Sequence, residues 1–216
     1  MLYCAGMGLP AEKHRFTVEE YLRMEEASPL RHEYHDGEIL AMSGGSLEHS
    51  IITTNVAAAL HAALVDKPCL VLDSNLKVGI ISARRFVYPD VHVICGQPQF
   101  DPRDATHQTV TNPRVVVEVF SPSTEGYDRG GKFNLYRELE SFEEYVLVSQ
   151  DTASVETFFR QQHGTWLFTP YSGLDAVLKL RSLNLELRLS DVYARVDFRK
   201  EPDAAVDGLP KSGERG

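Results

Sequence analysis

Two apolar runs in the middle of the chain are each interrupted by a single carboxylate. The run FVYPDVHVI, at residues 86–94, contains Asp90, and the run RVVVEVF, at residues 114–120, contains Glu118. Valine, isoleucine and aromatic residues dominate both runs and predict strands, and the second run is typical of a central strand buried on both faces. A charge inside such a strand is costly unless it is paired or bound to a metal ion. The two acids therefore need a partner.

The first third of the chain predicts a helix, a hairpin and a longer helix. A capping-box signature at Thr17 opens the helix TVEEYLRMEEA. The Asp36-Gly37 pair is a strong signal for a two-residue turn between two short strands. Apolar residues then recur with a helical period over residues 46–66.

The remaining segments predict a mixed fold. Strand patterns recur in CLVLD, LKVGII, EEYVLVS, SVETFFR and TWLFTPY. A turn and a helix follow the Glu118 run, and Asp128 is the expected N-cap of that helix. This order predicts an α/β domain with a central mixed β-sheet flanked by helices, an additional N-terminal hairpin and C-terminal strands. We expect one domain at residues 17–198, a loose extension at 1–16 and a disordered tail at 199–216.

Composition narrows the class of protein. The chain has 216 residues and 43% hydrophobic residues, enough for one domain with its own core. Its three cysteines lack a CxxC pair and do not indicate a disulfide framework or a zinc ribbon. No stretch has the pattern of a signal peptide or a membrane span, so a cytoplasmic location is expected. The net charge of -9 argues against a protein that coats nucleic acid nonspecifically.

Strand geometry predicts how the two acids could meet. Side chains alternate along a strand, so Asp90 and Glu118 point into the same pocket if their strands are neighbours. Two adjacent carboxylates repel each other, and a divalent cation removes that penalty. Oxygen ligands favour Mg²⁺ or Mn²⁺, and such an ion can activate water for attack on a phosphodiester. The alternative is that each acid only forms a structural ion pair with an arginine.

Two other motifs give competing interpretations. His32, His35 and Glu38 are metal-ligating residue types and would fit a cupin-like site. Residues three apart on a strand point to opposite faces, however, which argues against that site. The segment Gly130-Gly131-Lys132 resembles the end of a phosphate-binding loop, but the pattern G-x-x-x-x-G-K-[ST] is absent. We therefore disfavour both interpretations.

A set of longer motifs resembles one known family. The segments YPDV, VVVEVFSPST and YDRGGKFNLY, preceded by EYHDGEILAMSGGSLEH, are similar to the Uma-type family of candidate restriction endonucleases. That family is a branch of the PD-(D/E)XK nuclease superfamily, and the resemblance runs from about Thr17 to Arg195. It implies a restriction-endonuclease-like core. It also implies an endonuclease that depends on Mg²⁺ or Mn²⁺ and acts on DNA as a homodimer.

The resemblance assigns roles to individual residues. Asp90 corresponds to the acid of the PD motif and Glu118 to the acid of (D/E)XK, so both are expected to bind the metal, helped by the backbone carbonyl of Val119. Phe120 stands where the superfamily usually has its lysine. In the Uma-type branch that lysine is on the following helix. Lys132 stands there and is expected to position the attacking water or to stabilise charge on the phosphate.

The resemblance also covers weaker candidates. Glu33 is a possible third metal ligand or hydrogen-bond acceptor, and His49 would contact phosphate or orient a carboxylate, although a structural role is an alternative for either residue. Ser121 and Ser123 are expected to shape the turn after the Glu118 strand. A different class of function stays open: a nuclease-like protein that does not cut and serves as a nucleic-acid-binding or scaffold protein. Phe120 favours that alternative, and the two retained acids oppose it.

Overall fold

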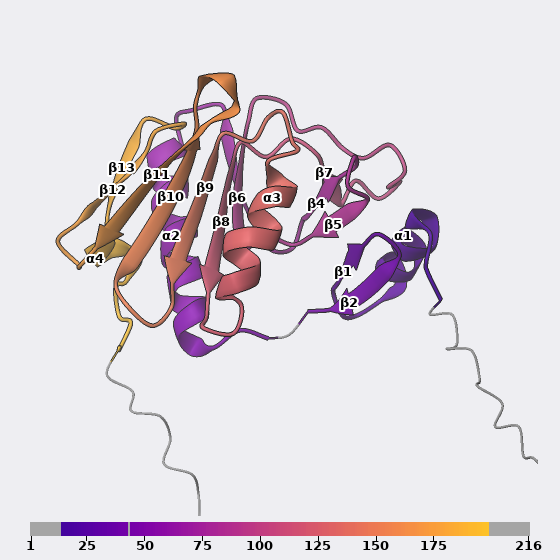
Figure 1. Ribbon diagram of the computed structural model, residues 1–216, viewed down its shortest axis with the longest axis horizontal. Helices are drawn as coiled ribbons and strands as arrows, with labels where there is room; N and C mark the ends of the chain where they lie inside the picture. Colours follow the sequence, from indigo (N-terminus) through magenta and orange to yellow (C-terminus); the bar gives the residue numbers. More distant parts are fainter. Residues whose placement is uncertain (1–13, 43, 199–216) are drawn as a thin grey trace, which may run out of the picture.

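A six-stranded mixed sheet forms the centre of the computed structural model, which describes residues 14–42 and 44–198 (Figure 1). Its strands are β3 Cys69–Asp73, β6 Val91–Cys95, β8 Val115–Phe120, β9 Glu144–Ser149, β10 Ser154–Arg160 and β11 Trp166–Ser172. Their order in space is β11-β10-β9-β8-β6-β3. Strands β8 and β9 are parallel, and the other neighbours are antiparallel. All residues of β8 are buried, as its apolar run predicts for a central strand.

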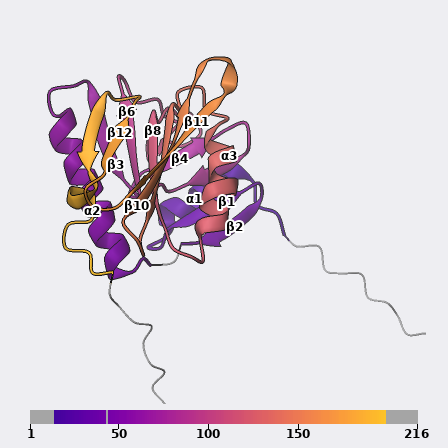
Figure 2. The same cartoon turned by 60° about the vertical axis from the view of Figure 1, so that its left-hand side comes forward.

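Helices cover both faces of this sheet (Figure 1, Figure 2). Helix α2, Leu47–Leu64, buries its apolar side against the valines of β6, β8 and β9. The opposite face carries a continuous helical segment, formed by the π-helix η1, Tyr127–Lys132, and by α3, Phe133–Tyr136. The predicted mixed sheet flanked by helices is confirmed.

The C-terminal elements extend the core on the α2 side. They are the hairpin strands β12, Val177–Leu180, and β13, Leu185–Arg188, and the short helix α4, Leu189–Val192. Their leucines and valines belong to the same apolar cluster as α2. The expected C-terminal strands are therefore present, and they help to fix α2 on the sheet.

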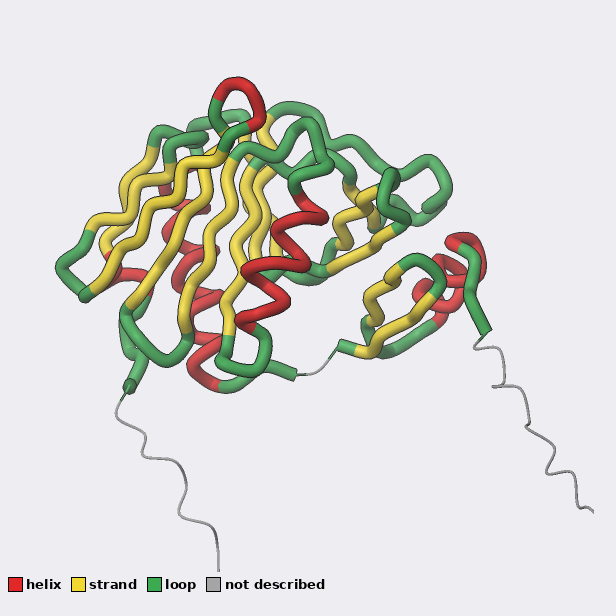
Figure 3. The backbone as a smooth tube through the Cα atoms, viewed as in Figure 1, coloured by secondary structure: helices red, strands yellow, loops and turns green. Residues whose placement is uncertain are grey.

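A second, smaller sheet lies beside the first (Figure 3). Its strands are β1 His32–His35, β2 Glu38–Ala41, β4 Lys77–Ile80, β5 Arg85–Val87 and β7 Thr109–Val110, in the order β2-β1-β5-β4-β7. The predicted hairpin is confirmed, since Asp36 and Gly37 adopt φ angles of 46° and 100° between β1 and β2. Helix α1, Val18–Ala27, begins with the predicted capping box at Thr17 and packs Tyr21 against this sheet.

The link between the two sheets corrects one prediction. Residues 86–94 do not form one strand, because the chain leaves β5 through Tyr88 and Pro89 and enters β6 in the other sheet. Proline cannot donate to a strand ladder and fixes its own φ angle, which explains the break. Asp90 therefore stands immediately before β6 rather than inside a strand.

The helical segment after β8 corrects a second prediction. Asp128 is not its N-cap, because Gly126 and the residues that follow it already have helical dihedral angles. The Asp128 side chain is instead buried and lies near Lys132. Asp128 is therefore the second residue of the helical segment, and its carboxylate lies 3.5 Å from Lys132 Nζ.

The cysteines correct a third prediction. Cys69 and Cys95 form a disulfide between β3 and β6. They stand directly opposite each other in the antiparallel pair, so the strand register brings them together and the 26 positions between them give no sequence signal. The disulfide lies at the end of β6 that is remote from Asp90.

The predicted terminal segments lie mostly outside the residues that the structure describes. Most of the expected extension at 1–16 and all of the expected tail at 199–216 lie outside them. Within them, Phe16 contacts the small sheet, and its N–H donates a hydrogen bond of 2.9 Å to the Gly37 carbonyl. The single domain at 17–198 stays a prediction. A search of the described helices finds none with the length and apolar character needed to cross a membrane.

Candidate active site

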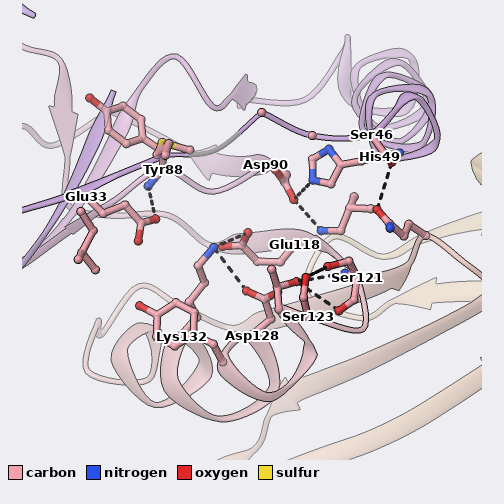
Figure 4. A pocket seen from close by; sticks show the side chains of 18 of the residues that line it. Glu33, Ser46, His49, Tyr88, Asp90, Glu118, Ser121, Ser123, Asp128 and Lys132 are labelled. Carbon is pink, nitrogen blue, oxygen red and sulfur yellow. Dashed lines mark hydrogen bonds and ion pairs between the residues drawn. The ribbon is translucent and has the colours of Figure 1, made fainter. Parts of the chain in front are cut away.

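Glu118 is held in the centre of the site by two hydrogen bonds (Figure 4). It is only 2% exposed, because it lies on central strand β8 and faces the helical segment that follows. Lys132 Nζ donates to Oε2 over 3.0 Å, and the Tyr136 hydroxyl donates to Oε1 over 2.8 Å. Each oxygen of this buried carboxylate therefore has a donor, which offsets much of the cost of burial.

Asp90 lies beside the same strand, on the side of β6. Strands β6 and β8 pair as far as Val91 opposite Val117. Beyond that pair, the Val119 N–H donates to Asp90 Oδ2 over 2.7 Å. His49 Nε2 lies 3.2 Å from the same oxygen, and this hydrogen bond raises the pKa of His49 while burial opposes the shift. The first turn of α2 thus orients Asp90.

Lys132 carries a positive charge among several acids. Its Nζ lies 3.5 Å from Asp128 Oδ1, one helical turn away, in addition to its contact with Glu118. Burial lowers the pKa of Lys132, but the surrounding carboxylates, led by Glu118 and Glu33, raise it further than burial lowers it. The amine is therefore protonated at neutral pH.

Asp90, Glu118, Asp128 and Lys132 line one cavity of about 670 Å³. Glu33, from β1, lies on one side of it, and Ser46 and His49, from the start of α2, lie on the other (Figure 4). Glu33 Oε2 is 3.1 Å from His35 Nε2, which in turn is 3.3 Å from the Tyr127 hydroxyl. The cavity therefore joins residues from both sheets, from α2 and from η1.

The acids of the cavity differ in their affinity for protons. Burial raises the pKa of Glu118 to about 8, although the charge of Lys132 opposes this shift. Burial likewise raises the pKa of Asp128. For Glu33, burial raises the pKa, but the hydrogen bond with His35 and the charge of Lys132 together leave it below its usual value. Perturbed acids with opposite shifts in one cavity are typical of catalytic sites.

The donor set fits a hard divalent cation. No cluster of three His, Cys, Asp or Glu side chains in residues 14–42 and 44–198 is arranged as a metal site. The expected metal ligands are the carboxylates of Asp90 and Glu118 and the backbone carbonyl of Val119. The N–H and C=O of one strand residue point to the same edge, so the Val119 carbonyl faces Asp90 as its N–H does. Both hydrogen bonds to Asp90 use Oδ2, which leaves Oδ1 available to a cation.

The structure gathers the predicted residues in one place. Asp90, Glu118, Lys132, Glu33 and His49 all line the cavity. Their roles in binding and catalysis stay predictions.

Two further residues, Tyr136 and Asp128, belong to the site and were not among the predicted site residues. Tyr136 contacts Glu118 from the far end of the helical segment, and only the fold brings it there. Asp128 stands four residues before Lys132, a spacing that places both side chains on one helical face. That spacing is the sequence signal that would have identified Asp128. Phe120 packs in the core below the guanidinium of Arg129, whose carbon is 5.0 Å from the ring centroid.

The competing motifs do not form sites of their own. His32 Nδ1 lies 2.9 Å from Glu25 Oε2, away from the cavity that His35 lines, so the cupin-like interpretation fails. Ser121 and Ser123 lie in the turn after β8, and their hydroxyls are 2.8 Å apart, but the side chain that bonds to the backbone of this turn is Thr124, whose Oγ1 accepts from the Ser121 N–H over 3.1 Å. Both serines also line the cavity.

The fold is shared with a protein of known structure. A crystal structure from Anabaena variabilis ATCC 29413, described as "a putative nuclease belonging to DUF820", superimposes with a TM-score of 0.65. The match covers 82% of this chain and 97% of that chain, at 17% sequence identity. The expected restriction-endonuclease-like core is confirmed by this likeness.

Sequence comparison identifies the family. The family model Uma2, described as "Putative restriction endonuclease", matches residues 18–191. The chain therefore belongs to the Uma2 family. Among its relatives, the uncharacterized protein slr1290 of Synechocystis sp. is 38% identical over 185 residues, which are 85% of this chain and 94% of the relative. The uncharacterized protein sll1609 of the same organism is 31% identical over 169 residues, which are 78% of this chain and 94% of the relative.

Proposed function

We propose that this protein is a Mg²⁺- or Mn²⁺-dependent phosphodiesterase, and specifically a DNA endonuclease that cleaves by in-line attack of water. One observation carries the proposal: Asp90, immediately before β6, and Glu118, on the neighbouring strand β8, line the same cavity, and Lys132 Nζ lies 3.0 Å from Glu118. The Uma2 family supports a nuclease-like activity. The proposal includes both the identity of the metal, Mg²⁺ or Mn²⁺, and DNA as the substrate.

Asp90, Glu118 and the Val119 carbonyl would hold the cation. When bound, the ion lowers the pKa of a coordinated water and stabilises charge on the phosphate oxygens. His49 keeps Asp90 oriented through its hydrogen bond, and Tyr136 does the same for Glu118. These two donors fix the carboxylates before substrate arrives.

Lys132 would stabilise the negative charge that develops on the phosphoryl oxygens during attack. A positive charge that is already held in place, here by Glu118 and Asp128, costs no reorganisation when the reaction occurs. Phe120 has no charge and packs in the apolar core, so it cannot fill the role of the usual lysine. The Lys132 ammonium contacts Glu118 instead and supplies the positive charge. This contact argues against the alternative of a nuclease-like protein that has lost catalysis.

Two finer features also belong to the proposal. We expect a homodimer, as the family resemblance implies, because two sites can then act on the two strands of a duplex. We also expect a cytoplasmic location. Sedimentation of the purified protein at several concentrations measures the oligomeric state.

The decisive experiment is nicking of supercoiled plasmid DNA with Mg²⁺ or Mn²⁺. The variants Asp90→Asn and Glu118→Gln keep the shape of each side chain and remove its charge. We expect each to reduce the rate on the order of 10²-fold or more, because metal stabilisation contributes several kcal/mol to the transition state. Glu143→Gln is the matched control, since Glu143 forms a partly exposed ion pair of 2.8 Å with Arg114. Equal rates in all three variants, or no nicking by the wild type with either ion, would refute the proposal.

A further inference from the structure

Asp90 stands where the chain crosses from one sheet to the other. Strand β5 of the small sheet ends at Val87, and strand β6 of the large sheet begins at Val91. Residues 88–90 lie between these strands, so the position of their backbone depends on side-chain contacts. Val119 and His49 hold the Asp90 carboxylate from the side of the large sheet. The other side of the crossing needs an anchor of its own.

Tyr88 supplies that anchor from the side of the small sheet. It is 5% exposed, and its hydroxyl donates to Glu25 Oε1 over 2.8 Å. Its N–H donates to Glu33 Oε1 over 3.4 Å (Figure 4). Burial, followed by the hydrogen bond to Glu25, raises the pKa of Tyr88, so the hydroxyl keeps its proton and remains a donor. Side chain and backbone of Tyr88 are thus held by α1 and β1, two positions before Asp90.

Glu25 is a buried acid that the proposed chemistry does not use. It is 7% exposed near the end of α1 and does not line the catalytic cavity. The His32 N–H donates to Oε1 over 2.8 Å, and His32 Nδ1 lies 2.9 Å from Oε2. These contacts offset the cost of burying the carboxylate. The hydrogen bond from Tyr88 is the contact that joins Glu25 to the segment that carries Asp90.

Pro89 stiffens the connection between Tyr88 and Asp90. Its ring is buried, fixes its own φ angle and restricts the backbone of the residue before it. Few dihedral angles are therefore free between the anchored tyrosine and the carboxylate. A metal site tolerates displacements of its ligands of only about 0.2 Å.

We infer that Tyr88 and Glu25 are positioning residues for Asp90: the buried hydrogen bond between them fixes, from helix α1, the place of a carboxylate that would bind the metal. This inference rests on the proposed function, and it makes α1 a support of the metal site. A purely structural role of the same hydrogen bond would affect the stability of the fold and leave the affinity for metal unchanged.

Tyr88→Phe tests the inference, because it keeps the ring and removes only the hydroxyl. We expect its dissociation constant for Mn²⁺, measured without DNA by electron paramagnetic resonance of the free ion, to rise on the order of 10-fold. Tyr193→Phe is the matched control. Tyr193 is 3% exposed, donates to the Ser154 carbonyl over 2.7 Å and does not line the cavity. Denaturant unfolding should show a similar loss of stability in both variants, and only Tyr88→Phe should bind Mn²⁺ more weakly.

Substitutions of Glu25 show whether the two residues act through one hydrogen bond. Glu25→Gln keeps an oxygen that accepts from the Tyr88 hydroxyl, so we expect the wild-type affinity for Mn²⁺. Glu25→Leu removes the acceptor and should weaken binding as much as Tyr88→Phe does. The double variant Tyr88→Phe/Glu25→Leu should bind no more weakly than either single variant, because both changes remove the same bond.

The outcomes separate this inference from the proposed function. Equal dissociation constants in the wild type, Tyr88→Phe and Tyr193→Phe, with nicking by the wild type intact, would overturn the inference and leave the proposed function standing. Additive weakening in the double variant would also overturn it, since the two residues would then act independently. Failure of the wild type to bind Mn²⁺ would overturn the proposed use of a metal and this inference with it.

Discussion

Lys132 and Glu118 form a buried ion pair between a helix and the central strand of the sheet. Lys132 Nζ lies 3.0 Å from Glu118 Oε2, and the two side chains are 13% and 3% exposed. Strand β8 ends at Phe120, and the helical segment then folds back over the same face of the sheet. The amine thus reaches the carboxylate from the helix, while Phe120 packs in the core at the usual position of the lysine.

Removal of the amine should weaken the fold as well as the activity. Lys132→Met leaves Glu118 buried without its charged partner, which should cost about 3 kcal/mol of unfolding free energy at pH 9, where Glu118 is ionised in the wild type. Saturating Mn²⁺ should recover part of this loss, because a bound cation compensates the carboxylate charge. Denaturant unfolding with and without Mn²⁺ measures both effects.

The control for this prediction is Lys179→Met. Lys179 and Glu186 form an ion pair of 3.3 Å between exposed side chains, and such pairs contribute little to stability. We therefore expect no change in this variant. If the two methionine variants unfold at the same denaturant concentration, the buried pair is not a source of stability.

Tyr136 should act as a positioning residue for Glu118. Tyr136→Phe keeps the buried ring and removes only the hydrogen bond to Oε1. We expect the concentration of Mn²⁺ needed for half-maximal nicking to rise on the order of 10-fold, since residues that orient metal ligands typically affect metal affinity by this amount. Tyr21→Phe is the control, because Tyr21 is equally buried and donates to the His32 carbonyl outside the cavity. A normal Mn²⁺ requirement in Tyr136→Phe would show that Glu118 needs no such support.

The elements that the sequence predicts best are those with a local cause. The capping box at Thr17 and the turn at Asp36-Gly37 are correct because a few adjacent residues determine them. The strand around Glu118 is predicted correctly because burial on both faces favours apolar residues at nearly every position. Local chemistry decides each of these three features.

The site could be predicted only where a motif linked distant segments. Asp90 and Glu118 are recognisable from their apolar surroundings, and Lys132 from the family resemblance. Tyr136 and Asp128 enter the site through the path of the helix over the sheet, and that path is a property of the whole fold. The pairing of Cys69 with Cys95 depends in the same way on the register of two strands.

His92 should make the fold sensitive to acid. It is fully buried in β6, and neither ring nitrogen has a hydrogen-bond partner among the described residues. Burial lowers its pKa from 6.5 to about 4. Between these two values the unfolded chain binds a proton that the folded chain does not, so stability falls as pH decreases from 6.5 toward 4. The loss attributable to His92 amounts to about 3 kcal/mol.

The variant His92→Leu isolates this effect. Leucine fills the space without polar atoms, so we expect the variant to be at least as stable as the wild type at pH 7. It should lose less stability than the wild type between pH 6.5 and pH 4. Urea unfolding at several pH values measures the difference, and parallel curves for the two proteins would exclude His92 as the cause.

Gly131 should control the position of Tyr127 at the cavity. A Cβ atom at Gly131 would lie 2.5 Å from Tyr127 Cδ2, closer than real Cβ contacts allow. Gly131→Ala should therefore displace the ring that lines the cavity and reaches His35, and reduce the nicking rate on the order of 10-fold, since small displacements in a catalytic site are costly.

Gly130→Ala is the matched control, because a Cβ atom at Gly130 meets nothing within 4 Å. It should keep full activity and gain about 0.5–1 kcal/mol of stability from the lower backbone entropy of the unfolded chain. In the background of Tyr127→Ala, the Gly131→Ala change should have no further effect, because the ring that it displaces is gone. An equal effect of Gly131→Ala with and without the tyrosine would mean that the glycine serves the helix and not the cavity.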